Sequence, residues 1–173
     1  MNIEEAINKK RLVDFNLFQG EVIYRGICLL ATKKIVVIVN YNKRQNSFDG
    51  ISIFRNKNFE SFEVWKKKYT KINTQEIDDN VANFNIKQLR TYYTWFKKLR
   101  GKELVAIFCN NNFKDYDVGQ ILEVEKDRIK VRLVDIDGNW ISNKVFNIED
   151  INYFSFGTKY EKKLKKLTNP QTY

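Results

Sequence analysis

The sequence predicts a mainly β protein with helices (α+β), organised as two tandem five-stranded, bent antiparallel barrels joined by a helical segment. Three features indicate this fold class: a two-residue alternation of apolar and charged residues within 118–139, a recurrence of apolar residues at a spacing of 92, and an apolar helical pattern between the two halves. Period-two alternation is typical of half-buried strands, and ordered recurrence is typical of repeated structural units.

The clearest strands lie in residues 118–139. Apolar residues alternate with charged ones on both sides of the charged turn 126–128, and Asp137-Gly138 closes the second strand with a tight-turn pattern. The stretch therefore predicts a three-stranded antiparallel meander.

Apolar residues of the first half recur in the second half at a spacing of 92. Phe54, for example, recurs as Phe146. In the middle of the unit the register drifts by one or two residues, so that Gly26 corresponds to Gly119. Matched order over about sixty residues favours a duplicated unit over coincidence.

Each repeat is predicted to contain a helix followed by five strands. In the first repeat the helix covers 2–10, and the strands cover 11–18, 21–31, 34–42, 49–55 and 58–63. In the second repeat the helix covers 85–99, and the strands cover 103–109, 117–125, 128–136, 140–147 and 150–155. The corresponding domains are a first barrel with its N-terminal helix (1–66), a helical connector (67–100), a second barrel (101–156) and a basic C-terminal helix and tail (157–173).

The helix at 85–99 has apolar residues at i, i+3, i+7 and i+10, with further aromatic residues that widen the apolar face. A helix this apolar usually contacts two partners, and about sixty residues alone barely supply a core. We therefore expect this helix to pack between the two barrels. A basic helix around 63–72 precedes it, and a final helix ends before Pro170.

Charge is distributed unevenly along the 173 residues, which carry a formal net charge of +10 and have a pI near 9.5. Residues 1–62 carry +4, whereas residues 101–156 carry −3. A basic chain suggests an anionic partner such as nucleic acid or a membrane surface, although a bias towards Lys, Asn and Ile also follows from AT-rich coding. The first half is therefore the better candidate for binding a polyanion.

Cysteine use and hydropathy indicate a cytoplasmic bacterial protein. Cys28 and Cys109 lie in apolar runs without a C-x-x-C spacing, so we expect buried free thiols in a reducing compartment rather than a disulfide. The N-terminus lacks a signal-peptide pattern. The longest apolar region, 26–39, is interrupted by two lysines and is too short to span a bilayer.

The predicted order of a helix and five short strands resembles the Sm-like family of small β-barrels in both repeats. Gly26 and Gly119 match the glycine of the second strand, and the segment 54–62 keeps the family's Arg and Asn as Arg55 and Asn58 while losing its Gly. The matching segment of the second repeat loses both Arg and Gly, and the Asn of the family's other motif falls on a Val and a Lys. The resemblance implies RNA binding through two turns and, for the family, assembly into rings of six or seven, whereas a tandem chain with a large intervening helix favours a pseudo-dimer over a ring.

The first barrel offers the better surface for nucleic acid. If the family geometry applies, the turn between its second and third strands and the turn between its fourth and fifth strands converge on one face, where cations contact phosphates. The alternative is that these are ordinary solvated turns. The candidate binding residues in these two turns and in the loop between strands three and four are Lys33, Lys34, Lys43, Arg44, Arg55 and Lys57.

Other features have both a structural and a functional interpretation. The strand 35–39 is apolar on both faces, which indicates cover by the connecting helix or by another protein. Asp135 and Asp137 fit hairpin closure better than a metal pair. The remaining candidates are aromatic residues that fit core packing better than base stacking, and lysine runs that fit solvated helix faces better than phosphate grips: Trp140, Tyr153, Phe154 and Phe156, and Lys66–Lys68 and Lys162–Lys166.

Catalysis is the least favoured class of function. The sequence contains no His and no Gly-rich phosphate loop, nucleophile elbow or paired-carboxylate motif, so we expect no catalytic residue, no metal and no cofactor. The leading hypothesis is a non-enzymatic protein that binds RNA or single-stranded nucleic acid. The alternative is a protein-interaction or regulatory adaptor that docks a partner, or a second copy, through the acidic second barrel and the aromatic helix.

Overall fold

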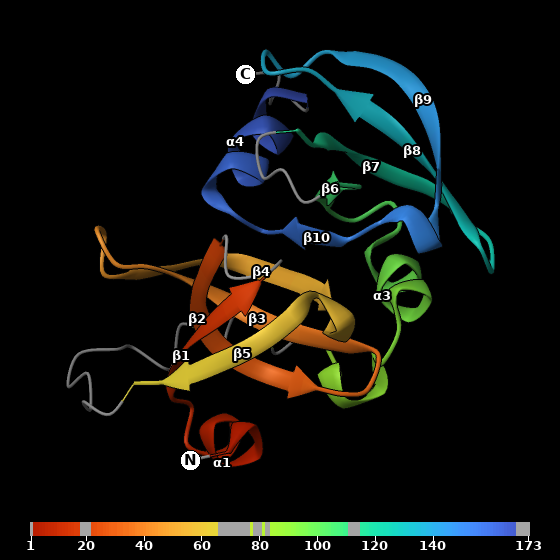
Figure 1. The fold of residues 1–173 in the computed structure, drawn as a ribbon. Coiled ribbons are helices and arrows are strands. Elements are labelled where there is room, and N and C mark those ends of the chain that lie inside the picture. The colour runs from red at the N-terminus through yellow and green to blue at the C-terminus, as the bar shows by residue number, and fades with distance from the viewer. Residues whose placement is uncertain are drawn as a thin grey trace. The chain divides into compact units, whose positions relative to one another are not determined.

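The structure is a computed structural model, and it describes residues 2–17, 22–65, 77, 81, 84–110 and 115–168 of the chain (Figure 1). The chain divides into two compact units, Met1–Arg90 (unit 1) and Thr91–Tyr173 (unit 2). Each unit consists mainly of antiparallel strands with short helices.

Unit 1 is an open antiparallel sheet with the strand order β5-β1-β2-β3-β4. A short helix precedes the sheet, and a single 3-10 turn links its last two strands (Figure 1). Its elements are α1 (Ile3–Asn8), β1 (Leu12–Leu17), β2 (Val22–Ala31), β3 (Ile35–Asn42), β4 (Ser47–Arg55), η1 (Asn56–Asn58), β5 (Phe59–Val64) and η2 (Ile86–Gln88).

Local sequence explains where these elements begin and turn. The Asn2 side chain accepts a hydrogen bond from the Glu5 N–H at 2.8 Å and so caps α1. In β2, Gly26 lies opposite Asn40, and a Cβ on Gly26 would stand 2.2 Å from the Val39 carbonyl oxygen. The two strands therefore approach this closely only because residue 26 has no side chain.

The core of unit 1 is apolar and aromatic. Phe54 is fully buried, with its ring edge-on to Tyr24 and to Phe59. All five residues of 35–39, which the sequence leaves apolar on both faces, are buried within the chain.

Unit 2 is likewise an open antiparallel sheet, with the strand order β10-β6-β7-β8-β9. A helix precedes the sheet and another follows it. Its elements are α3 (Tyr92–Leu99), β6 (Leu104–Phe108), β7 (Asp117–Val124), β8 (Arg128–Val134), β9 (Trp140–Asn147), η3 (Ile148–Asp150), β10 (Tyr153–Phe156) and α4 (Lys159–Thr168).

Both helices of unit 2 are capped and have buried faces. A capping box between Thr91 and Thr94 begins α3, and the Phe96 ring lies 4.5 Å, centroid to centroid, from Phe154 of β10. At the start of α4, the buried Glu161 carboxylate accepts hydrogen bonds from the Thr158 N–H and the Ser155 hydroxyl. The carboxylate is thus satisfied as a cap at a positive helix end.

The two units share one pattern of strand pairing. The first strand of each pairs with the second and the fifth, and the third pairs with the second and the fourth. Even the irregularities correspond: the register shifts between Cys28 and Leu30 in unit 1 and between Ile121 and Glu123 in unit 2. Gly119 repeats the role of Gly26, since its Cβ would stand 2.3 Å from a carbonyl oxygen of β8.

The predicted closure into two barrels is wrong. In the strand order β5 has β1 as its only neighbour and β9 has β8 as its only neighbour, so among the described strands β5 does not close onto β4 and β9 does not close onto β10. The ten strands occur near their predicted positions, but alternation along a strand specifies which side chains face the core and not whether distant strands meet.

The predicted single helix at 85–99 is also wrong. Residues 86–88 form η2, and α3 begins only after the Thr91 cap, because the threonine side chain satisfies the N–H of Thr94 and starts a new helix there. The apolar spacing continued across both helices and concealed the break. The predicted helix around 63–72 is wrong at its start, because Glu63 and Val64 belong to β5; residues 66–72 and Pro170 lie outside the described residues.

The two thiols are free, as predicted, but only one is buried. Cys28 is 1% exposed, whereas Cys109 is exposed because β6 ends at Phe108. Burial raises the pKa of the Cys28 thiol to about 12. Partial burial also raises the pKa of Cys109.

Candidate nucleic-acid interface

Two turns of unit 1 are joined by backbone hydrogen bonds. In the β2–β3 turn, the Thr32 hydroxyl accepts hydrogen bonds from the N–H groups of Lys34 and Ile35, at 3.1 and 3.0 Å. The N–H of Asn56 in η1 donates to the Lys34 carbonyl oxygen at 3.0 Å. The β2–β3 turn and the β4–β5 connection therefore lie side by side at one end of the sheet.

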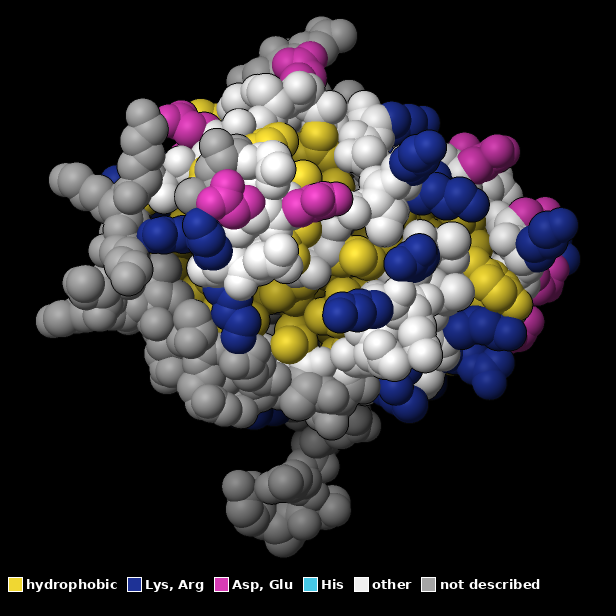
Figure 2. Space-filling model, turned by 90° about the horizontal axis from the view of Figure 1, so that it is seen from below, with side chains coloured by type: hydrophobic (Ala, Val, Ile, Leu, Met, Phe, Trp, Pro, Cys, Tyr) yellow, Lys and Arg dark blue, Asp and Glu magenta, His cyan; other side chains and the backbone are white. Residues whose placement is uncertain are grey.

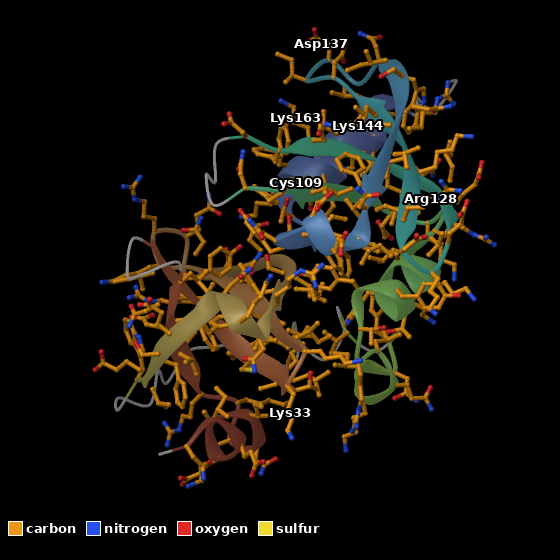
Figure 3. All side chains as sticks on the ribbon, turned by 45° about the vertical axis from the view of Figure 1, so that its right-hand side comes forward. Lys33, Cys109, Arg128, Asp137, Lys144 and Lys163 are labelled. Atoms are coloured by element: carbon orange, nitrogen blue, oxygen red, sulfur yellow. The ribbon has the colours of Figure 1, made fainter. Side chains whose placement is uncertain are left out.

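This end of the sheet gathers four of the six predicted cations, and we refer to Lys33, Lys34, Arg55 and Lys57 as the basic end of unit 1. Three are exposed and Arg55 is half-buried. Figure 3 shows Lys33 projecting from the tip of the β2–β3 hairpin. Within the described part of the chain, no acidic side chain pairs with Lys33, Lys34 or Lys57.

The other two predicted cations lie elsewhere. Lys43 and Arg44 occupy the β3–β4 hairpin, where the Asn42 side chain accepts the N–H of Arg44 at 3.0 Å. This hairpin follows the opposite end of the eight-residue strand β3, roughly 25 Å from the basic end at about 3.3 Å per residue. The six residues therefore do not form one site.

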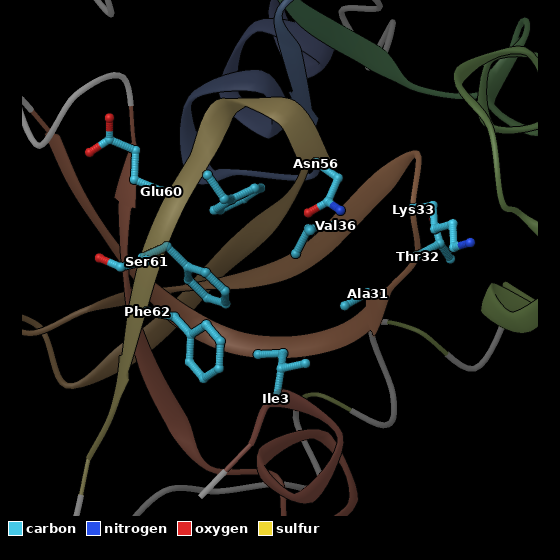
Figure 4. A pocket seen from close by; sticks show the side chains of 11 residues that line it. Ile3, Ala31, Thr32, Lys33, Val36, Asn56, Glu60, Ser61 and Phe62 are labelled. Carbon is cyan, nitrogen blue, oxygen red and sulfur yellow. The ribbon is translucent and has the colours of Figure 1, made fainter.

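A pocket of about 550 Å³ opens beside the basic end (Figure 4). Its lining comes from α1, the β2–β3 turn, η1 and β5, all in unit 1, together with single residues of β1, β2 and β3. Lys33 and Asn56 lie on one side of it, and Ile3 and Phe62 on another. The Glu60 carboxylate, also at its edge, points away from the interior (Figure 4).

The pocket has an aromatic interior. Phe15 is 2% exposed, and its ring meets the Phe59 ring edge-on at 5.2 Å between centroids. Phe62 is 41% exposed, so one ring of the lining is open to solvent. On the face shown in Figure 2, apolar side chains reach the surface between lysine and arginine side chains.

The corresponding turns of unit 2 have the same backbone arrangement. The N–H of Ile148 in η3 donates to the Asp127 carbonyl oxygen at 2.7 Å, as Asn56 does to Lys34. The side chains differ, because residues 125–128 and 147–150 hold two cations and four acidic groups. Arg128 is paired with Glu125 at 2.7 Å, which raises the pKa of Arg128.

Asp135 and Asp137 close a hairpin, as predicted. The Asp135 carboxylate accepts N–H groups of Asn139 and Asp137 at 2.8 and 2.9 Å, and Gly138 has a φ of +86°. These hydrogen bonds lower the pKa of Asp135, and the bond from the Asn139 N–H has the largest effect. Among the residues that the structure describes, no group of three His, Cys, Asp or Glu side chains is arranged to hold a metal ion.

The aromatic candidates lie in the core or on its edge. Tyr153, Phe154 and Phe156 are buried, which confirms packing as their role. Trp140 is half-buried under the Arg132 guanidinium, which lies 4.7 Å from its ring centroid. None of these four candidates is the solvent-exposed aromatic ring near the basic end of unit 1, which is Phe62.

Of the two lysine runs, the structure describes only the one on α4 in unit 2. Lys66–Lys68 lie outside the described residues. Lys162, Lys163 and Lys166 are exposed on α4, whereas Lys165 donates to Glu103 at 3.1 Å. Solvated helix faces account for these side chains.

Sequence reasoning missed Asn56 and Phe62 as functional candidates. In the sequence, Phe62 is one of the apolar residues that recur at a spacing of 92, as Phe154. Simple alternation along β5 gives no signal for it, because the register shift between Asn16 and Leu17 places Phe59 opposite Leu17 and Phe62 opposite Phe15, so that both rings lie on one face.

No helix in the described parts of the chain has both the length and the apolar character needed to cross a membrane. Comparison of the sequence and the structure with protein-family models, curated proteins and solved structures finds no match.

Proposed function

We propose that the protein is a non-enzymatic, cytoplasmic binder of RNA or single-stranded nucleic acid that contacts phosphates through the basic end of unit 1. The observation that carries the proposal is the hydrogen bond between the Asn56 N–H and the Lys34 carbonyl oxygen, which fastens the two turns together. Four cations from two segments are thereby held at one end of a sheet.

Phosphate recognition needs positive charge more than it needs a particular fold. Each cation that neutralises a phosphate releases condensed counterions, and the logarithm of the binding constant of a single strand falls by about 0.7 per contact for each tenfold rise in salt. Four contacts correspond to a slope of about −3. Binding through this surface therefore shows a steep dependence on salt and little preference for sequence.

The resemblance of residues 54–62 to the Sm-like motif supports the same interface. Arg55 and Asn58, the residues kept from that motif, flank Asn56 and Lys57 at the join between the two turns. The proposal does not depend on the resemblance, since the charges and the backbone geometry stand without it.

The test is a binding isotherm of a 12-nucleotide RNA, measured by fluorescence anisotropy at several salt concentrations. The double variant Lys33→Glu/Arg55→Glu is expected to abolish binding, because it turns two phosphate contacts into repulsions. The matched control is Lys126→Glu/Arg128→Glu, which makes the same change in net charge at the corresponding turn of unit 2.

The proposal predicts that the control binds within about threefold of the unmodified protein, a difference below 1 kcal/mol. Equal loss in both double variants would mean that net charge alone drives association. Absence of binding to any RNA at low salt by the unmodified chain would also contradict the proposal.

A second candidate, the protein-interaction adaptor, is favoured by the edge of unit 2. Ile141 and Val145 of the terminal strand β9 are 63% and 57% exposed. The aromatic helix is not the docking element, since Tyr92, Trp95 and Phe96 are buried. Recovery of a protein partner in high salt, lost with Ile141→Lys/Val145→Lys and without RNA, would favour this function.

A further inference from the structure

One flank of helix α4 carries apolar side chains that remain exposed. Glu161 and Leu164 are buried, so they determine which side of α4 faces the interior of unit 2. Tyr160, Lys163 and Leu167 follow one another at i, i+3 and i+7 on a different side, and all three are exposed. This spacing places them on one face of the helix, and the methylene groups of a lysine continue an apolar stripe. We refer to these three residues as the α4 stripe.

Two other segments of unit 2 add exposed apolar side chains next to the α4 stripe. The Tyr116 ring is 40% exposed and meets the Tyr160 ring at 85°, with 6.4 Å between the two centroids. The hairpin between β8 and β9 lies against α4, since a Cβ on Gly138 would stand 2.4 Å from the Leu167 Cβ. Ile136 in this hairpin is 75% exposed. The apolar surface therefore draws on three segments that are far apart in the sequence.

Contacts within unit 2 hold this surface in place. The Tyr116 ring is stacked on Phe108 at 4.8 Å between centroids, and Phe108 is stacked on the buried Tyr153 at 3.9 Å. On the inner side of α4, the Lys165 ammonium group donates to the Glu103 carboxylate at 3.1 Å. A surface whose supporting side chains are already packed loses less conformational entropy when a partner binds.

The solvent side of α4 is positively charged. Lys162, Lys163 and Lys166 are exposed, and none of them forms an ion pair with another residue that the structure describes. Water solvates these lysines in the isolated chain. A partner that lies along the α4 stripe must approach all three, so acidic side chains are favoured at its edge.

We propose that the α4 stripe, together with Tyr116 and Ile136, docks an acidic amphipathic helix of another protein. The apolar face of that helix packs on the stripe, and its carboxylates pair with the three exposed lysines. The inference does not rest on the nucleic-acid interface, because every residue that carries it belongs to unit 2.

The surface favours a helix over other partners. A helix packs its side-chain ridges into the grooves of another helix, whereas strand addition needs unpaired backbone groups that the body of a helix does not offer. An anionic membrane is disfavoured because Asp135 and Asp137 flank Ile136 in the exposed hairpin (Figure 3). A nucleic acid would stack on planar rings, and Ile136 and Leu167 are aliphatic.

The probe is a fluorescein-labelled peptide of three repeats of the heptad LEALEEA, whose leucines fall on one face of a helix between glutamates. As a helix it spans about 30 Å, enough to cover the roughly 10 Å from Tyr160 to Leu167. Fluorescence anisotropy with the full chain is expected to show saturable binding. Amide NMR signals of α4 and of the hairpin at 135–139 are expected to shift. The same peptide with lysine in place of glutamate is expected not to bind.

Reversal of charge on α4 tests the contribution of the lysines. Lys162→Glu/Lys166→Glu is expected to weaken peptide binding about tenfold, because two attractive contacts become repulsive. The matched control is Lys43→Glu/Arg44→Glu, which makes the same change in net charge at two exposed residues of the β3–β4 hairpin. This control is expected to bind the peptide within about threefold of the unmodified chain, a difference below 1 kcal/mol.

Removal of the apolar side chains tests the stripe itself. Tyr160→Ser/Leu167→Ser leaves the net charge unchanged and is expected to weaken peptide binding about tenfold, because apolar area is no longer buried. Ile141→Ser/Val145→Ser, at two exposed apolar residues of β9, is the control and is expected to bind normally. A circular dichroism spectrum identical to that of the unmodified chain shows that each variant is folded.

Four results would overturn the proposal. Equal weakening by the two charge-reversal variants would mean that net charge alone attracts the peptide. Unchanged affinity of Tyr160→Ser/Leu167→Ser would mean that the stripe is not in the interface, and a loss confined to Ile141→Ser/Val145→Ser would place the peptide on β9. Absence of peptide binding, with sedimentation of the chain on phosphatidylserine vesicles, would assign the surface to a membrane.

Discussion

Units 1 and 2 place different chemistry on the same arrangement of strands. At the end where the second and third strands turn, residues 32–35 and 55–58 of unit 1 carry four cations and no acid, whereas residues 125–128 and 147–150 of unit 2 carry two cations and four acids. The hydrogen bonds that join the two turns correspond in both units. The backbone therefore does not determine the charge of this surface, which differs between the units because the side chains differ.

Several cations on the strands of unit 2 are paired with acidic side chains of the same unit. Lys130 pairs with Glu123 at 2.9 Å and Lys144 with Asp117 at 2.7 Å. Exposed pairs like these add little to stability, about 0–1 kcal/mol each, but they neutralise charge that would otherwise attract a polyanion. The contrast explains why only unit 1 is proposed to bind nucleic acid.

The largest expected effect concerns the close approach of neighbouring strands, which both units share. Gly26→Ala and Gly119→Ala each place a Cβ within 2.3 Å of a carbonyl oxygen of the neighbouring strand. Because backbone atoms must move, each is expected to lower the free energy of unfolding by about 3 kcal/mol, the upper end of the cost of overpacking. Urea denaturation followed by circular dichroism measures the loss, and hydrogen exchange shows which unit opens.

Gly157→Ala is the matched control. A Cβ at Gly157 meets nothing within 4 Å, so this change costs only the strain of a φ of +72°, about 1 kcal/mol. Equal midpoints for Gly26→Ala and the unmodified chain would show that the close approach does not exist. Opposite behaviour of Gly26→Ala and Gly119→Ala would break the correspondence between the units.

The sequence was sufficient for the strands and their local order. Alternation and the 92-residue recurrence placed all ten strands, and the hairpin at Asp137-Gly138 followed from turn chemistry. Closure could not be read from the sequence, because the curvature that brings distant strands together has no local pattern. The break at Thr91 was missed for a different reason: apolar spacing outweighed a threonine cap that was visible in the sequence.

The candidate site was predictable only in part. The two turns with their cations were identifiable because charge and turn residues are local properties. The pocket was not, since Ile3, Phe15 and Phe62 are far apart along the chain and meet only once α1, β1 and β5 are in place. Lys43 and Arg44 were grouped with the site by charge, and the length of β3 separates them from it.

The two units hold different residues at one equivalent cross-strand position. In unit 1 it holds Asp14 opposite Arg25, joined by two hydrogen bonds of 2.5 and 2.6 Å, and in unit 2 it holds Ala106 opposite Val118. Asp14→Ala is expected to cost about 2 kcal/mol, because it leaves a largely buried guanidinium without its carboxylate. Urea denaturation measures this loss.

The double variant Asp14→Ala/Arg25→Val installs the pair of unit 2 in unit 1. Replacing both partners of an ion pair by apolar residues is often nearly neutral, so the double variant is expected to lie within about 1 kcal/mol of the unmodified chain. The double variant still loses the contact between the Arg25 guanidinium and the Trp65 ring, whose centroid lies 4.3 Å from the guanidinium carbon. A double variant less stable than Asp14→Ala would show that the two positions are not equivalent.

The smallest expected effect concerns Cys28, whose counterpart in unit 2 is the buried Ile121. Burial raises the pKa of the folded thiol from 9.0 to about 12. The neutral thiol is favoured in the folded state, so its stabilising contribution is complete below pH 9 and is lost as the pH rises towards 12. At pH 10 the loss is about 1 kcal/mol.

Cys28→Val removes this titration and brings the position closer to the apolar one in unit 2. Between pH 8 and pH 10, the free energy of unfolding of the unmodified chain is therefore expected to fall by about 1 kcal/mol more than that of Cys28→Val, since lysines and tyrosines titrate alike in both. Cys109→Ser, at the exposed thiol, is the control and is expected to follow the unmodified chain more closely. Parallel pH profiles for Cys28→Val and the unmodified chain would mean that the Cys28 thiol ionises as readily in the folded state as in the unfolded state. Water would then reach Cys28 in β2, at the position that the buried Ile121 occupies in unit 2.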